Sequence, residues 1–152
     1  MANTQAISTS FKQDLLNGLH AFGASVIRGA TTKDTFYGAL YLASGSLGAG
    51  TTAYSATSEV SGTGYTAGGA AFTNATAPTT SGTTAYWTPS ASIAWTGLTL
   101  STAFDTILMY NFTAADSNAV ANWNFGSTTI TAGTLTLTMP TNNSSNALLR
   151  LA

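Results

Sequence analysis

The sequence contains no cysteine, so disulfide bonds and thiolate chemistry are excluded and the redox compartment stays undetermined. Charged residues are also scarce: they make up 6% of the 152 residues, against about 25% in a typical soluble domain. The four Lys and Arg residues are scattered, and the net charge is -1. Binding to nucleic acid by counterion release needs clustered basic residues. We therefore expect no nucleic-acid partner.

Long apolar runs are missing as well. No stretch approaches the roughly 20 apolar residues that a membrane-spanning helix needs. The N-terminus lacks the basic region and the apolar region of a signal peptide. We expect no membrane partner. The residues that are present, 44% hydrophobic and 11% aromatic, argue against disorder and predict one domain with a sizeable core.

Charge is absent altogether between Val60 and Phe104. A freely diffusing monomer usually keeps its surface charged and free of large patches. Two interpretations remain open for this neutral span. Either neighbouring molecules cover it in an assembly, or Thr and Ser coat a neutral surface.

The N-terminal region predicts a polar arm over residues 1 to 9, followed by a single domain over residues 10 to 152. Ser10 and Gln13 have the spacing of a capping box, in which their side chains satisfy exposed amides at a helix start. Apolar residues then recur at helical spacing. We expect an amphipathic helix from about Phe11 to Phe22 that docks onto the core of its own domain.

The remainder of the chain predicts an all-β fold, an antiparallel β-sandwich or jelly roll of seven or eight short strands. Thr35 to Ala43 is apolar on both faces, which is typical of a buried central strand. We expect Asn74 to Thr84 to form an exposed loop. The other expected strands are the residues leading to Thr73, Tyr86 to Trp95 as an edge or bulged strand, Phe104 to Phe112, Ala119 to Phe125, Ile130 to Met139 and Ala147 to Ala152.

A glycine-rich segment, Tyr54 to Phe72, carries a single charge. Its glycines predict tight turns and close backbone approaches. Their spacing is one residue too long for a dinucleotide-binding fingerprint, no helix start follows, and the chain has no Gly-Lys-Ser/Thr. We predict a structural role for this segment, at an edge of an assembly interface, with Glu59, Gly62, Gly64, Tyr65, Gly68 and Gly69 as its key residues.

The remaining polar residues do not form a recognisable catalytic or metal-binding pattern. His20 is the only histidine, and a catalytic role would require a nucleophile and an orienting carboxylate beside it. We expect it to pack, or to form a hydrogen bond, between the helix and the sheet. Asp105 and Asp116 are too few carboxylates for a calcium site, even with Asn111 and Asn118. The sequence predicts no enzyme, no cofactor and no metal site.

Aromatic side chains allow one further binding hypothesis. Tyr65, Tyr86, Trp87 and Trp95 would form a sugar-stacking platform if they were exposed together, although aromatic residues of an all-β domain usually belong to the core. An exposed cluster among Tyr86, Trp87 and Trp95 would favour a glycan-binding or adhesion module.

Several segments resemble small structural proteins of tailed-phage virions, of the head decoration or cement type. The resemblance lies in Ser10-Phe11-Lys12 through His20, Ala39-Leu40-Tyr41, Leu47 to Tyr54, Glu59 to Gly69, Thr106 to Asn111 and Thr134 to Pro140. It implies a β-sandwich or jelly roll that binds the major capsid protein on the outer capsid surface after assembly in the host cytoplasm. It further implies a homo-oligomer, a dimer or trimer, and supplies no catalytic residue. A tail or neck protein of the same particle is the alternative.

Overall fold

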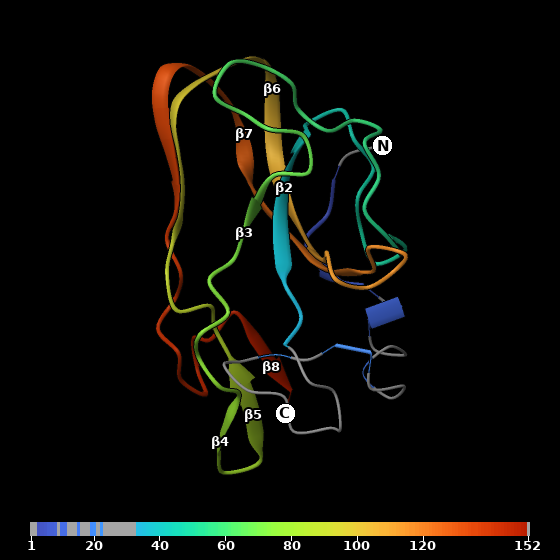
Figure 1. Ribbon diagram of the computed structural model, residues 1–152, viewed down its shortest axis with the longest axis vertical. Helices are drawn as coiled ribbons and strands as arrows, with labels where there is room; N and C mark the ends of the chain where they lie inside the picture. Colours follow the sequence, from blue (N-terminus) through green and yellow to red (C-terminus); the bar gives the residue numbers. More distant parts are fainter. Residues whose placement is uncertain are drawn as a thin grey trace.

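The computed structural model describes residues 3–8, 10, 11, 15, 19, 20, 22 and 33–151. These residues form an all-β fold of eight strands in two antiparallel sheets (Figure 1). The larger sheet has the order β1-β7-β6-β2-β3 and the smaller one β4-β5-β8. The strands are β1 (Ala6–Ile7), β2 (Phe36–Leu42), β3 (Ala70–Ala71), β4 (Thr79–Ser81), β5 (Thr84–Trp87), β6 (Ile93–Asn111), β7 (Ala119–Leu137) and β8 (Leu149–Leu151).

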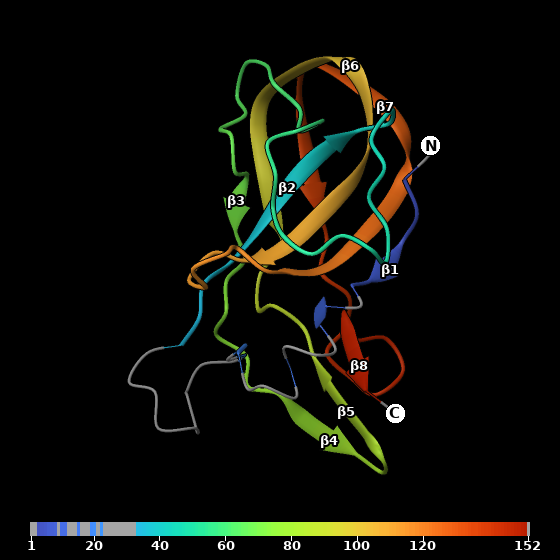
Figure 2. The same cartoon turned by 90° about the vertical axis from the view of Figure 1, so that its right-hand side faces the viewer.

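Strands β6 and β7 are 19 residues long each and pair with one another along most of their length. They form a ribbon that bends over at one end of the molecule (Figures 1 and 2). The register shifts repeatedly between Trp95 and Phe104, which marks the bend as a series of bulges. The ribbon therefore has two limbs. The inner limb pairs with β2, and the outer limb contains Ile93 to Trp95 paired with Leu135 to Leu137.

This ribbon corrects the expectation of short strands only. Phe104 to Asn111 belongs to one continuous strand with Ile93, so the strand predicted to Phe112 ends one residue earlier. Ala119 to Phe125 is continuous with the strand predicted from Ile130. The intervening residues are mostly Thr, Ser and Ala, and apart from Trp95, Leu98 and Leu100 they have no large apolar side chain that would mark a core strand. Gly97 and Ala132, with φ of 62° and 47°, accommodate the bend.

The core lies mainly between the two limbs. Its fully buried members include Leu98 and Leu100 near the bend, Phe104 on the inner limb and Leu40 on β2. A second cluster covers the opposite face of β2 and β6 and contains Tyr41, Leu108 and Tyr110. Both faces of β2 are thus covered, which confirms the central strand predicted over Thr35 to Ala43.

The smaller sheet departs from the predicted pattern at three places. The supposed loop Asn74 to Thr84 contains β4, which pairs with β5 as a hairpin around Gly82, whose φ is 58°. The segment Tyr86 to Trp95 is divided between β5 and β6, since Pro89 lacks an amide hydrogen and does not continue a ladder. The last strand, β8, is shorter than Ala147 to Ala152.

Residues 3–8, which belong to the predicted N-terminal arm, contact the rest of the domain. Strand β1 pairs with Ala121 and Asn122 of β7, and Asn3 is buried. Most of the helix predicted over Phe11 to Phe22 lies outside the described residues, and Leu19, His20 and Phe22, which are described, are not helical. Phe11, Leu15 and Phe22 contact the core, and Phe22 stacks on Phe36 with ring centroids 4.5 Å apart. Within the described residues, no helix has the length and apolar character needed to cross a bilayer.

Candidate functional site

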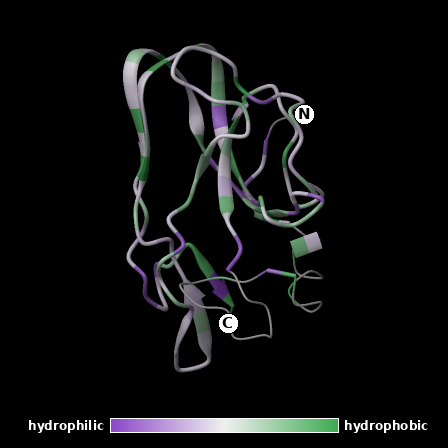
Figure 3. Cartoon of the chain, viewed as in Figure 1, coloured by the Kyte–Doolittle hydropathy of each residue, from purple (hydrophilic) through white to green (hydrophobic). Residues whose placement is uncertain are grey.

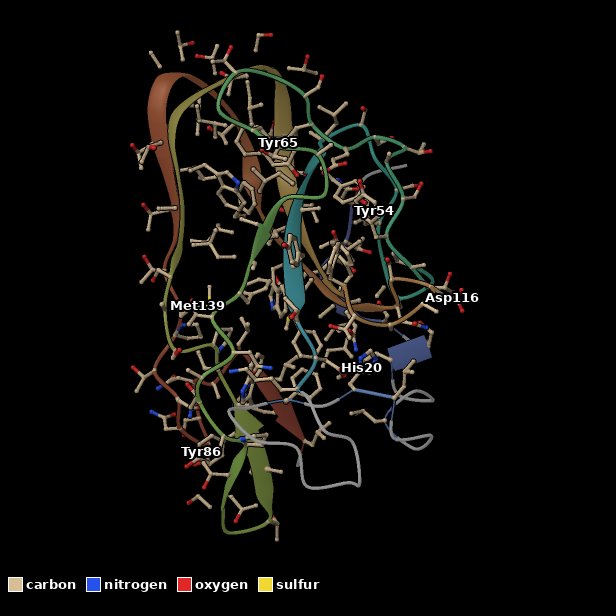
Figure 4. The ribbon with its side chains drawn as sticks, in the orientation of Figure 1. His20, Tyr54, Tyr65, Tyr86, Asp116 and Met139 are labelled. Carbon is tan, nitrogen blue, oxygen red and sulfur yellow. The ribbon has the colours of Figure 1, made fainter. Side chains whose placement is uncertain are left out.

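Glu59 lies at the centre of a hydrogen-bond cluster beside β2. Its Oε2 accepts a hydrogen bond from the Tyr54 hydroxyl at 2.6 Å. Its Oε1 accepts two more, from the Tyr65 hydroxyl and the Gly68 amide, both at 2.7 Å. Figure 4 shows Tyr54 and Tyr65 on the same side of the molecule, near β2. Bonds to a carboxylate are stronger than neutral ones, so Glu59 fixes the segment that follows it.

Tyr65 connects this cluster to the sheet. Its hydroxyl donates to Glu59 and accepts a hydrogen bond from the Leu40 amide at 3.0 Å. A side chain thus takes the place of a neighbouring strand at this point of β2. Nearby, the Val60 amide donates to the Leu40 carbonyl and the Leu42 amide to the Ser58 carbonyl, at 3.0 and 2.9 Å.

Further tyrosines surround the cluster from the face of β2 and β6. The Tyr110 hydroxyl donates to the Gly68 carbonyl at 2.8 Å, and its ring stacks on Tyr54 with centroids 4.8 Å apart. Tyr41 donates to the Ser55 carbonyl. Burial, together with the negative charge of Glu59, raises the pKa of Tyr110 to about 12 and the pKa of Tyr41, Tyr54 and Tyr65 still further. The phenols therefore remain protonated donors at neutral pH.

The glycines allow this segment to approach two parts of the sheet at once. A Cβ on Gly69 would lie 1.9 Å from the Gly38 carbonyl oxygen of β2, and a Cβ on Gly62 would lie 2.2 Å from the Thr99 carbonyl oxygen of β6. Both distances are far below any real contact. Gly64 and Gly68 have φ of 77° and 89°. The Thr99 amide also donates to the Thr63 carbonyl at 2.9 Å, so the segment links β2 to the bend of β6.

The structure therefore brings the predicted residues Glu59, Tyr65 and Gly68 into direct contact and places the other three glycines at close approaches or left-handed turns. The contributions of Tyr54 and Tyr110 were missed. Nothing in the local spacing identifies Tyr110, because it reaches Gly68 from a strand 42 residues further along the chain. The outer surface of the segment, residues 61–64, 66 and 67, is exposed and carries no charge.

His20 lies in a separate buried cluster near the end of β6. The Asn111 side chain, which is fully buried, contacts the His20 Nδ1 at 3.0 Å and donates to Asp34 at 2.9 Å. Its Oδ1 accepts from the amides of Thr113 and Ala114. The imidazole also packs against Phe11, with ring centroids 4.9 Å apart. These contacts agree with the packing and hydrogen-bonding role expected of His20.

Asp105 and Asp116 do not converge on a common site. Asp105 accepts hydrogen bonds at 2.7 Å from Asn3 and from Thr106. It precedes Asn111 by six positions on the same strand, about 20 Å at the strand rise per residue. Asp116 is exposed in the turn beyond that strand end (Figure 4). Among the described residues, no group of three His, Cys, Asp or Glu side chains is placed to hold a metal ion.

The aromatic platform is also contradicted. Trp87 and Trp95 are only 2% and 6% exposed. The Trp87 indole donates inward to the Thr76 carbonyl at 2.9 Å, and Tyr65 is held against Glu59. Tyr65 and Tyr86 are both half-buried (Figure 4). Trp87 and Trp95 belong to the core, so Tyr86, Trp87 and Trp95 do not form an exposed cluster.

Comparison of the chain with protein-family models, with curated proteins and with solved structures gave no match.

Proposed function

We propose that this chain is a non-enzymatic structural protein of a phage virion, a capsid decoration or cement protein. It binds the major capsid protein on the outer capsid surface, bridges neighbouring subunits and acts as a homo-oligomer, a dimer or trimer. The observation that carries the proposal is an exposed, uncharged segment that partly buried hydrogen bonds fix to the sheet. Residues 61–67 are fixed by Glu59 and Tyr65 and begin a span without charge that reaches Phe104.

Such a segment suits a binding surface for physical reasons. A rigid loop loses little conformational entropy when it binds, which favours affinity. An uncharged surface also avoids the cost of removing charges from water. A cement protein must bury surface on two subunits at once, and a standard specific interface buries about 1,600 Å². Many weakly bound copies on one shell then act together.

The proposal includes the finer fold, a β-sandwich or jelly roll. It is supported by the two limbs of the β6–β7 ribbon, which face each other across the main core. Strands that switch layers through bulges are typical of such folds. A compact domain of this kind presents loops and edges to neighbouring subunits.

The decisive experiment compares phage particles with and without the protein. Particles that lack it should lose their DNA at a lower temperature, and added purified protein should restore the release temperature. Thr66→Lys, on the exposed side of the segment, should bind the shell less well, whereas Thr80→Lys on β4 should bind normally. Particles that are equally heat-stable without the protein would contradict the proposal.

The position of the protein in the particle separates the two virion roles. In a particle reconstruction, copies distributed over the whole shell would support decoration of the head. Copies confined to a single vertex would instead identify a tail or neck protein.

A further inference from the structure

One side of the larger sheet is closed. Strand β3 pairs with Tyr37 and Gly38 of β2, and the remaining edge groups of β2 are satisfied by Tyr65, Val60 and Ser58. Short edge strands and covering loops are two ways in which proteins prevent unwanted pairing of sheet edges. The β2 side therefore offers no free ladder to another chain.

On the opposite side, most of the sheet edge has no paired strand among the described residues. Strand β1 pairs with only Ala121 and Asn122, and the Ser8 amide donates to the Val120 carbonyl. From Trp123 to Leu137, no strand of the described residues pairs with the edge of β7 that faces away from β6. Every second residue of a strand points its backbone amide and carbonyl to one edge. A long row of these groups therefore faces outward along β7.

This edge has bulges near the bend, but it has no charged residue and no proline to block pairing. Charged side chains and proline normally protect an exposed strand from pairing. The chain has no charged residue from Ser117 to Leu149, and β7 has no proline. Figure 3 accordingly shows the outer limb of the ribbon in white and green rather than purple. On the other edge of this limb, β6 is interrupted by the register shift after Trp95 and is bridged to Thr63 at Thr99.

The end of β7 is self-complementary. Residues 134–138 alternate Thr and Leu: the threonines are exposed, and Leu135 and Leu137 are half-buried against the core. Two copies paired antiparallel around Thr136 would place Leu135 opposite Leu137, and Thr134 opposite Thr138. Matched neighbours of this kind stabilise a pair of strands, and no like charges oppose each other.

An apolar cavity of about 380 Å³ lies next to this edge, lined by Phe72, Ile107, Trp123, Phe125, Leu137 and Met139. Phe125 is 40% exposed, and Figure 4 shows Met139 at the end of the outer limb. Leucines of an added strand would continue the apolar row of Leu135 and Leu137 beside this cavity. Pairing would therefore bury apolar surface in addition to forming backbone hydrogen bonds.

We propose that the outer edge of β7 binds a second copy of this chain, through antiparallel pairing of residues 134–138 about a twofold axis at Thr136. The proposal rests on the homo-oligomer part of the proposed function and assigns its interface. Because the same patch is used on both copies, the interface is isologous and gives a dimer.

A single introduced cysteine tests the register, since the chain has none of its own. Opposed Cβ atoms of an antiparallel pair are about 4.5–5.5 Å apart, close to the separation that a disulfide needs. Thr136→Cys should therefore form a disulfide-linked dimer rapidly under mild oxidation at low protein concentration. Thr96→Cys, exposed on β6 of the same limb, is the matched control. Crosslinking of Thr136→Cys no faster than that of the control would overturn the proposal.

Sedimentation of the purified protein provides the second measurement. Wild type should be a dimer, and Thr136→Lys should shift it to monomer by at least tenfold in Kd, because each lysine would face its own copy. Thr80→Lys should remain dimeric. A monomeric or trimeric wild type, or a fully dimeric Thr136→Lys, would refute the twofold pairing. Because no capsid is present in these two experiments, their outcomes are independent of binding to the shell. Binding to the shell without crosslinking would reject the β7 dimer interface but not the virion role. Crosslinking without binding to the shell would reject the virion role but not the dimer interface.

Discussion

Gly69 shows most directly why this segment needs glycine. Its φ of 78° disfavours any side chain, and a Cβ would collide with the Gly38 carbonyl oxygen, a backbone atom that cannot turn away. We expect Gly69→Ala to lower the free energy of unfolding by about 3 kcal/mol, from the left-handed backbone and the overpacking together. Urea denaturation followed by tryptophan fluorescence measures the change.

Gly82 is the matched control for this substitution. It also has a positive φ, 58°, but no atom lies within 4 Å of a Cβ built there. Gly82→Ala should cost about 1 kcal/mol, from backbone strain alone. Equal losses in the two variants would show that the contact with β2 contributes nothing.

Tyr65 satisfies a backbone amide and a carboxylate with one oxygen atom. Tyr65→Phe should cost about 1–3 kcal/mol, because the Leu40 amide and Glu59 each lose a partner. The loss should be smaller in a Glu59→Gln background, since the two residues belong to one network. The hydroxyl of Tyr86 forms no hydrogen bond with the described residues, so Tyr86→Phe should stay within about 0.5 kcal/mol. If the losses of unfolding free energy in Tyr65→Phe and Glu59→Gln simply add in the double mutant, the two residues do not belong to one hydrogen-bond network.

Asp105 makes the free energy of unfolding depend on pH in the acidic range. Burial alone raises the pKa of its carboxyl, but hydrogen bonds from Asn3, Thr106 and Asn124 together outweigh burial and lower it. The folded state therefore favours the ionised form. This stabilisation is complete above the unfolded pKa of about 3.9 and is lost as the pH falls through the lower folded value.

The corresponding measurement is the urea midpoint at neutral pH and below about pH 4. The wild type should lose stability on acidification, and Asn3→Ala, which removes a hydrogen bond that lowers the pKa, should lose less between the same two pH values. An acid loss of equal size in Asn3→Ala would show that this bond does not carry the effect.

Among the elements, those with a local signal were predictable and those held by distant contacts were not. Strand β2 could be recognised because seven successive residues are suited to burial on both faces. Residues 134–138 alternate strictly between Thr and Leu, and the exposure of Thr134, Thr136 and Thr138 follows this alternation. The continuity of β6 and β7 could not be inferred, because bulges interrupt the period of two.

The candidate site was predictable only in part, for the same reason. The glycines and Glu59 stand out within one short segment. Their partners do not: Gly38 and Tyr110 lie on β2 and β6, and no spacing rule links them to Gly69 and Gly68. Strand β4 was overlooked because its three residues, Thr79–Ser81, have no apolar member.

The bulge in β7 leads to a prediction of its own. Ala132 has a φ of 47°, a left-handed conformation that costs about 1–2 kcal/mol for a residue with a Cβ. Ala132→Gly should therefore raise the unfolding free energy by up to about 1 kcal/mol, the gain being reduced by the greater freedom of glycine in the unfolded chain. Ala94→Gly, in the extended part of β6, should destabilise instead. A loss of stability in both variants, measured by thermal unfolding, would exclude strain at Ala132.

The whole molecule presents two long stretches without charge, Val60 to Phe104 and Ser117 to Leu149. Contacts made through them should not depend on Coulomb attraction. We expect dimerisation, and binding to capsid shells, to change less than about threefold between roughly 0.05 and 0.5 M NaCl, a range over which charge attraction is strongly screened. A steep loss of either association with salt would assign it to the few charged residues.

The closure of β2 by Tyr65 has a consequence for the size of the assembly. A sheet with two free sides is able to add copies indefinitely and to form a fibre. Here the edge of β2 is already occupied by the chain's own tyrosine and loop, so copies that pair through β7 are not able to add a further copy through β2. Loss of the Tyr65 hydroxyl therefore matters beyond folding, because it would leave the Leu40 amide at this sheet edge without its partner and open to pairing with another strand.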